Sequence, residues 1–131
     1  MRKLSELLQE ADWKSEKHVP VIDALDVVGK DEIVRAAISV GREVAHPSTT
    51  AHHIDWISLY FLPEGESFPY RIGSASFDSH GASTDGADTS GVYSHHEAVF
   101  AFRTRKPGSL LAVSHCNIHG LWQSSKEIRI R

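Results

Sequence analysis

The segment IDWISLYFLPEGE, residues 54–66, is the most informative stretch for the fold. Isoleucine, leucine, tryptophan, tyrosine and phenylalanine fill most of residues 54–62, a composition typical of a β-strand. The PEGE tetrapeptide at residues 63–66 places proline close to glycine, which is a turn signal. The segment therefore predicts a long apolar strand over residues 54–62 that ends at a turn.

Shorter runs on both sides of this segment have the same character. Val34, Ala36, Ile38 and Val40 alternate with other residues, several of them polar, as in a half-buried strand. The tripeptide Lys-Pro-Gly at residues 106–108 predicts a turn, and with it an antiparallel hairpin between the strands on either side. The remaining predicted strands cover residues 70–77, 98–104, 109–114 and 128–130.

The N-terminal segment has a different period. Leu4, Leu7, Leu8 and Ala11 follow helical spacing, which predicts one short amphipathic helix over residues 3–11. Such a helix could pack on the rest of the chain or on another subunit.

A polar stretch interrupts the predicted strands. Residues 78–91 are rich in glycine, serine, threonine and aspartate and are flanked by strands of similar character, so they predict a long surface loop. Many short strands with one small helix predict an all-β chain, folded as an antiparallel β-sandwich with a short N-terminal helix.

Length and composition limit the classes of protein. The 131 residues, 40% of them hydrophobic, suit a single domain that spans residues 1–131. A net charge of −3 gives no broad basic face for nucleic acid. No apolar run approaches the ~20 residues that span a bilayer, and the N-terminus lacks the continuous apolar stretch of a signal peptide. We therefore expect a soluble, cytoplasmic protein, and the single thiol fits a reducing compartment.

The only cysteine, Cys116, stands three residues before His119. This spacing lets a thiolate and an imidazole reach one metal ion from a single turn. Further ligands would have to come from the other histidines, since the chain has nine. Two other segments contain candidate histidines. They are HPSTTAHH at residues 46–53 and His18, which stands just before a Val-Pro pair. His46 and one of the adjacent pair His52 and His53 are candidates, because neighbours on an extended chain point to opposite faces.

The number and kind of ligands leave several metals open. Thiolate and imidazole bind iron, copper and zinc. A structural zinc site usually closes at four ligands and commonly has two or more cysteines, which this chain lacks. A blue-copper site would need a weak axial ligand, and Gln123 would have to take the place of methionine. A non-haem iron oxygenase would use two histidines and one carboxylate. Four histidines with one cysteine would suit a five-coordinate iron with an open sixth position.

Some of these residues have a simpler interpretation. A lone cysteine is more often a small buried hydrophobe, and a lone histidine more often a hydrogen-bonded residue. We apply that interpretation to His80, His95, His96 and His115, although the adjacent pair His95 and His96 is a second metal candidate.

Two charged residues precede His18. Lys17 would attract an anionic substrate to an ion with an open position. Glu16 could itself cap that position with its carboxylate. Lysine and glutamate in a polar segment can equally be solvated surface.

The combined motifs resemble superoxide reductases of the neelaredoxin type, the single-iron relatives of desulfoferrodoxin. The resemblance runs from about residue 12 to the end of the chain, and the segments that contain the histidines and the cysteine occur in the same order as in that family. The segments that carry it are EKHVPVI (16–22), VGRE (40–43), HPSTTAHHI (46–54), LYFLPEGE (59–66) and CNIHGLW (116–122).

This resemblance implies a fold, a cofactor and a reaction. It implies an immunoglobulin-like β-sandwich with one mononuclear iron ion (Fe2+/Fe3+), and one-electron reduction of superoxide to hydrogen peroxide without dioxygen. It further implies a rubredoxin-like electron donor and a homo-oligomer, either a dimer or a tetramer. Glu16 matches a carboxylate that can occupy the sixth position, and Lys17 matches a lysine that steers superoxide and helps protonate the product. The implied iron ligands are His18, His46, His52 and His119 in the equatorial plane and Cys116 as the axial thiolate.

Four positions depart from the family pattern, and none is an implied ligand. They are Ala45 for proline, Ser48 for asparagine, Ala51 for glutamate and His115 for tyrosine. With no other cysteine, the chain cannot hold the four-cysteine, rubredoxin-like iron centre of the two-iron desulfoferrodoxins.

Overall fold

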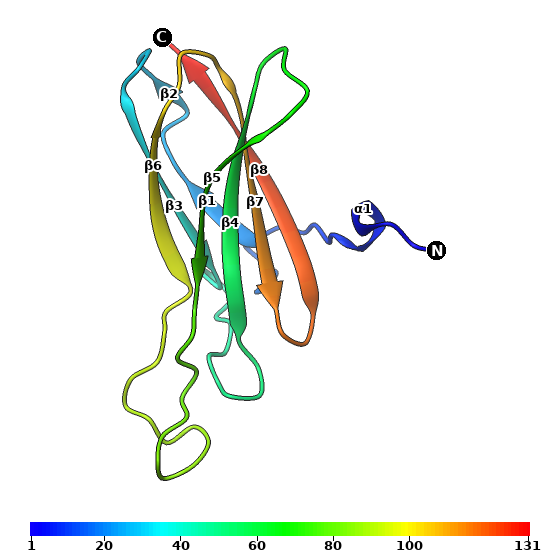
Figure 1. Cartoon of the computed structure of the whole chain (residues 1–131), viewed down its shortest axis with the longest axis vertical. Helices are drawn as coiled ribbons and strands as arrows, with labels where there is room; N and C mark the ends of the chain where they lie inside the picture. The colour runs from blue at the N-terminus through cyan, green and yellow to red at the C-terminus, as the bar shows by residue number, and fades with distance from the viewer.

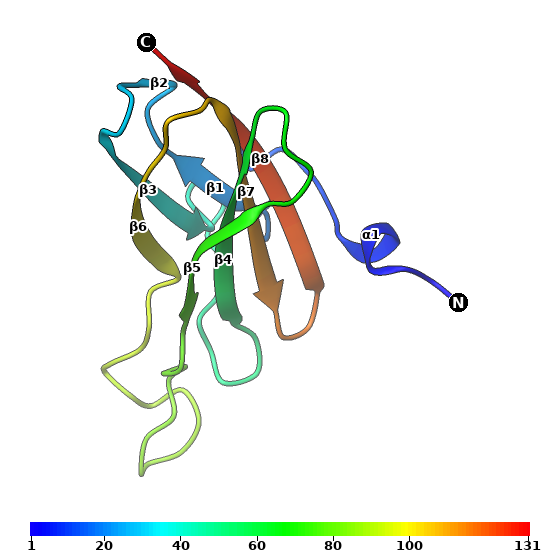
Figure 2. The same ribbon diagram turned by 45° about the horizontal axis from the view of Figure 1, so that its top comes forward.

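The computed structural model describes residues 1–131 as two β-sheets packed face to face, with a small helical arm (Figures 1 and 2). All strand pairs are antiparallel except β2 with β8, which is parallel. The predicted β-sandwich with a short N-terminal helix is therefore confirmed. The three-stranded sheet has the order β1 (Pro20–Asp23), β3 (Ile33–Val40) and β6 (Glu97–Arg103). The five-stranded sheet has the order β2 (Val27–Val28), β8 (Gly120–Ile130), β7 (Gly108–Cys116), β4 (Ile54–Pro63) and β5 (Tyr70–Ser76).

The core lies between the two sheets and is built from alternating side chains. Strand β3 buries every second residue, and the buried ones are the four that the sequence pattern singles out. Strand β4 opposes them with Ile57 and Leu59, and β7 adds Leu110, all three with no exposed surface. Burying a side chain of this size stabilises a fold by about 1.5–3 kcal/mol, so the facing rows of β3, β4 and β7 hold the sandwich together.

Three strands differ from the prediction. Strand β8 runs from Gly120 to Ile130, although only residues 128–130 were expected to be extended. Its middle carries polar residues, and its backbone is held instead by β7, with which it forms nine aligned pairs. Strands β1 and β2 were not predicted. β1 is an edge strand that begins at Pro20, where proline can be tolerated because no ladder donor is needed.

The predicted hairpin around residues 106–108 is wrong. Strand β6 pairs with β3 in one sheet, and β7 pairs with β4 and β8 in the other. The turn therefore carries the chain across the sandwich from one layer to the next. The strands on either side of it contribute to the same core from opposite faces, a relation that a local turn signal does not reveal.

The helix is shorter than the predicted span of residues 3–11. Helix α1 covers Leu4–Leu7, has no buried residue and projects away from the sheets (Figure 1). At Gln9 the backbone pairs with strand β8: its N–H donates to the carbonyl of Leu121 at 3.0 Å, and its carbonyl accepts from the N–H of Gln123 at 2.9 Å. These strand-like bonds exclude continuation of the helix. No helix of this protein has the length and apolar character required to cross a membrane.

Four connecting segments meet at one end of the sandwich, the lower end in Figure 1. They are the approach to β1, the link between β3 and β4, the short turn between β7 and β8, and the long link between β5 and β6. The predicted surface loop at residues 78–91 falls inside the last of these links and contains only isolated bridges. Every candidate metal ligand lies on one of these segments or at the end of the strand beside it.

Candidate metal centre

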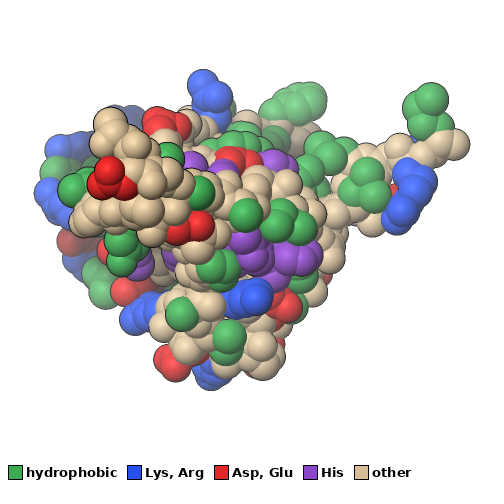
Figure 3. All heavy atoms as spheres, turned by 90° about the horizontal axis from the view of Figure 1, so that it is seen from below, with side chains coloured by type: hydrophobic (Ala, Val, Ile, Leu, Met, Phe, Trp, Pro, Cys, Tyr) green, Lys and Arg blue, Asp and Glu red, His purple; other side chains and the backbone are tan.

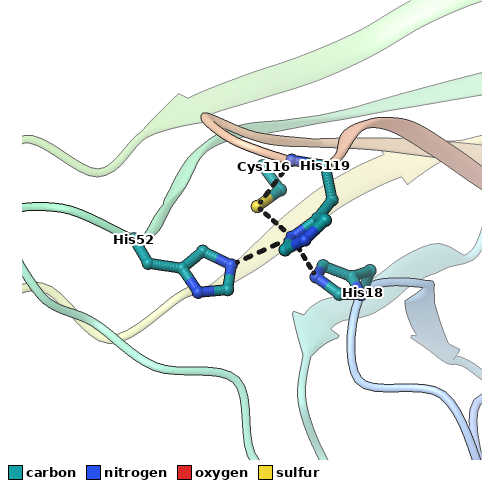
Figure 4. A group of neighbouring side chains, drawn as sticks. All are labelled: His18, His52, Cys116 and His119. Carbon is teal, nitrogen blue, oxygen red and sulfur yellow. Dashed lines mark hydrogen bonds between the residues drawn. The ribbon is translucent and has the colours of Figure 1, made fainter.

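Four of the predicted ligand residues converge at this end of the sandwich. One ligand atom from each lies within 4.8 Å of the others. Figure 4 shows the three imidazole rings and the thiol pointing toward a common centre. They come from three separate parts of the chain: His18 precedes β1, His52 precedes β4, Cys116 ends β7 and His119 stands in the following turn.

His119 lies at the middle of this group. Its Nδ1 atom is 3.0 Å from Nε2 of His18, 3.2 Å from Nε2 of His52 and 3.7 Å from Sγ of Cys116. A neutral imidazole nitrogen carries either one proton or one lone pair, so it can satisfy only one of these neighbours. Several lone pairs directed at one point fit a bound cation better than a hydrogen-bond network.

His46 is the fourth histidine beside this centre. Its ring centroid is 4.9 Å from that of His18 and 4.6 Å from that of His52. Nδ1 of His46 donates to the carbonyl of Pro47 at 2.7 Å, which leaves a lone pair on Nε2. That Nε2 atom is buried and has no hydrogen-bond partner. Burial lowers the pKa of His46 to about 4, so the ring is neutral. A buried acceptor without a donor requires an explanation, and a metal ion would supply one.

Cys116 is buried with no exposed surface. The backbone N–H of His119 donates to its sulfur at 3.4 Å. A hydrogen bond to a ligating sulfur reduces the electron density that the sulfur donates, so this contact would tune a bound metal.

The Glu16 carboxylate contacts Nδ1 of His18, the ring nitrogen on the side away from the centre. Its Oε1 atom accepts from Nδ1 of His18 at 2.6 Å and from the His18 backbone N–H at 2.9 Å. Burial opposes ionisation of Glu16, but the hydrogen bonds and charge of His18 bring its pKa below the ordinary value. The carboxylate fixes the His18 tautomer and directs Nε2 to the centre, as outer carboxylates do for metal-bound histidines. The structure thus gives Glu16 an orienting contact, and the capping role that the sequence suggested stays a prediction.

Lys17 is half buried and forms no ion pair. Burial lowers the pKa of His52, and the charges of His119, His18 and Lys17 lower it further. The ammonium group is therefore close enough for its field to act on the histidine cluster. Figure 3 views this end of the molecule and shows histidines gathered on the surface with a basic side chain beside them.

The other histidines separate into two groups. His53 turns away from the centre, as expected for the neighbour of His52, and its Nε2 atom lies 3.0 Å from Oδ1 of Asp55. His95 is 78% exposed, and His96 is buried with its ring against that of His46. The pair at residues 95 and 96, the second metal candidate in the sequence, is not part of any cluster of ligand atoms.

A different second cluster is present, and the sequence interpretation missed it. It consists of His53, Asp55 and His80, whose ligand atoms lie within 4.8 Å of one another. The spacing of His53 and Asp55 was a usable signal, because residues two apart on an extended chain share a face. No local pattern places His80 beside them, because it lies in the long link between β5 and β6.

Comparison with known proteins agrees with this geometry. The family model described as desulfoferrodoxin matches residues 10–125. A superoxide reductase of Pyrococcus furiosus is 50% identical over 92% of this chain and 95% of its own length. Neelaredoxin of Megalodesulfovibrio gigas is 46% identical over 98% of this chain and 99% of its own. The reduced superoxide reductase (neelaredoxin) of Archaeoglobus fulgidus superposes with a TM-score of 0.87 at 54% identity, covering 94% of this chain and 98% of its own. The chain therefore belongs to the desulfoferrodoxin family.

Proposed function

We propose that this chain is a superoxide reductase whose residues 1–131 form a single iron-binding domain. The observation that carries the proposal is the buried, unpaired Nε2 of His46 beside a cluster of three further histidines and one thiol. The names of the relatives, superoxide reductase and neelaredoxin, support the same reaction. The proposed ligands are His18, His46, His52, Cys116 and His119.

The donor set favours iron over the other metals. Zinc in structural sites closes at four ligands, and blue copper uses two histidines, one cysteine and a weak axial ligand. Four imidazoles and one thiolate exceed both sets. The side chain of Gln123, the axial substitute that a copper site would need, donates from Nε2 to Glu10 at 3.0 Å.

The residues around the centre have separate tasks in the proposed reaction. A bound iron ion would supply one electron to superoxide, which takes up two protons and leaves as hydrogen peroxide, while a donor such as rubredoxin restores the electron. Cys116 would supply a thiolate that raises the electron density at the metal, as thiolates do in haem proteins. Glu16 keeps His18 in one tautomer, and the His119 backbone N–H limits the donation from sulfur. Lys17 attracts the anion and holds a proton on Nζ that the product can receive.

Further parts of the proposal concern the setting of the protein. We place it in the cytoplasm, where a reduced electron donor is available, and assign one iron ion to each chain. We also propose a homo-oligomer, either a dimer or a tetramer. The arm at α1 supports this assignment, because Leu4 and Leu7 are 60% and 42% exposed and contact no core of their own chain.

Electron paramagnetic resonance of the mildly oxidised protein tests the metal, and a superoxide assay tests the reaction. We expect a high-spin ferric signal and hydrogen peroxide formed without dioxygen when a reductant is supplied. A cupric signal would instead identify an electron carrier of the blue-copper type. A silent spectrum with zinc in the metal analysis would refute a redox function at this centre.

Replacing Lys17 with alanine is expected to slow the reaction with superoxide by about 3- to 10-fold at low ionic strength, because a local attracting charge is lost. The dependence of the rate on salt should also become weaker, since screening then acts on fewer charges. Pulse radiolysis at several salt concentrations measures both effects.

The matched control for this variant is Lys30→Ala, which changes the net charge equally. Lys30 is exposed in the link between β2 and β3, at the opposite end of β3 from the centre. A Lys17→Ala rate and salt slope equal to those of Lys30→Ala would exclude the steering role.

A further inference from the structure

A second group of ligand atoms lies outside the centre described above and shares no residue with it. Its members are His53, Asp55 and His80, all partly exposed. Nε2 of His53 is 3.0 Å from Oδ1 of Asp55. The rings of His53 and His80 are stacked, with centroids 3.5 Å apart and planes inclined by 6°. Two imidazole rings and one carboxylate thus lie together, and an ion bound by both rings would require His80 to turn out of this stack.

The backbone of β4 is shaped to present this carboxylate. Ile54 pairs with Cys116 and Trp56 pairs with His115, so Asp55 is the extra residue of a β-bulge. A bulge redirects a side chain relative to the regular alternation of a strand. Here it places Asp55 between two histidines, because Oδ2 accepts from Nδ1 of His115 at 2.7 Å while Oδ1 faces His53.

The hydrogen bond made by Nδ1 of His53 decides whether its Nε2 atom carries a proton or a lone pair. Nδ1 of His53 donates to the carbonyl of Thr49 at 2.8 Å. In the neutral ring, Nε2 then carries a lone pair, and this lone pair faces a carboxylate oxygen. Two acceptors at 3.0 Å repel each other unless Nε2 is protonated, which makes an ion pair, or a metal ion lies beside them. The nearby ring of His80 supplies a further nitrogen for such a cation.

We propose that His53, Asp55 and His80 form a second site, which binds a divalent metal ion such as zinc. Imidazole nitrogen and carboxylate oxygen are both zinc ligands, and three protein ligands leave a position for water. The outer contacts also match those of metal sites, in which a ligating histidine donates its other N–H to a carbonyl and a ligating carboxylate accepts a second hydrogen bond. Thr49 and His115 make these two contacts.

An ion at this site would cross-link the long segment between β5 and β6 to the loop that carries His52. Asn117 already accepts the backbone N–H of His53 at 2.8 Å, and Asp88 in the long link accepts that of Thr50 at 2.8 Å. The ion would add His80 to these ties. Its role is therefore to brace the loop next to the first centre, and its ligands do not depend on which metal occupies that centre.

Zinc titration of the purified protein, with the metal of the Cys116 centre retained, tests the proposal. We expect one zinc ion per chain to bind in addition to that metal. Asp55→Asn and His80→Ala should each weaken this binding at least 10-fold, since even outer contacts of metal sites are worth about 10- to 100-fold in affinity. Cobalt(II) gives an independent readout: it should show d–d absorption without a sulfur-to-cobalt band, because this site has no thiolate.

The matched control is His95→Ala, which removes an exposed histidine paired with Glu97 at 3.9 Å and should leave zinc affinity unchanged. Unchanged visible absorption of the first centre and unchanged thermal unfolding would show that the variants are folded. No zinc bound beyond the first metal, or equal affinity in Asp55→Asn and the parent protein, would overturn the second site. His53 and Asp55 would then be an ordinary ion pair.

Discussion

Replacing Cys116 with serine is expected to abolish the visible sulfur-to-iron charge-transfer absorption and to lower superoxide reduction by more than about 100-fold. Loss of an outer contact in a metal site already costs about 10- to 100-fold, and this change removes a proposed ligand. A serine hydroxyl is a much weaker donor than a thiolate and stays protonated near neutral pH. Absorption spectra of the oxidised protein and pulse radiolysis measure the two effects.

The serine variant should remain folded, so that the loss can be assigned to the sulfur. Cys116 is fully buried, but serine is of similar size and the backbone N–H of His119 remains available to its oxygen. His95→Ala serves as the control, because it removes a surface histidine outside both clusters. An unchanged visible spectrum in the serine variant would mean that the chromophore does not contain this sulfur and that the ligand assignment is wrong.

The fold was predictable from sequence where one face of a strand is apolar. Strands β3 and β4 have that pattern and were predicted within one residue at each end. Strand β8 was mostly missed, because its central residues are polar and its position is set by pairing with β7. The hairpin at residues 106–108 was wrong for a related reason: a turn signal reports a change of direction but does not report which sheet the next strand joins.

Parts of the candidate site were likewise predictable from sequence, and other parts were not. The short spacing of Cys116 and His119 is local, and the segments around His18 and residues 46–53 were visible as histidines at turns. Their convergence depends on three segments that meet at one end of the sandwich. The orienting contact of Glu16 joins residues two apart in the chain, but the sequence pattern does not show which way the carboxylate turns. The placement of His80 beside His53 arises from tertiary structure and has no signal in the local sequence.

Replacing Gly41 with alanine is expected to have the second largest effect, through the position of His46. Gly41 has φ = +81°, and a Cβ atom there would lie 2.5 Å from the backbone nitrogen of His46 and 3.1 Å from its Cβ atom. The left-handed conformation costs alanine about 1–2 kcal/mol by itself. The overlap with His46 adds to that cost, because the partner is backbone and cannot rotate away.

Displacement of His46 should weaken the metal centre as well as the fold. We expect a loss of at least about 10-fold in metal affinity, as for other changes that misplace a ligand, together with a lower free energy of unfolding of the metal-free protein. Gly65→Ala separates the two causes: Gly65 has φ = +80°, but a methyl group there would meet no atom within 4 Å, so only the conformational cost applies. If Gly41→Ala and Gly65→Ala lose the same stability and both keep the metal, the contact with His46 has no role in holding that ligand in place.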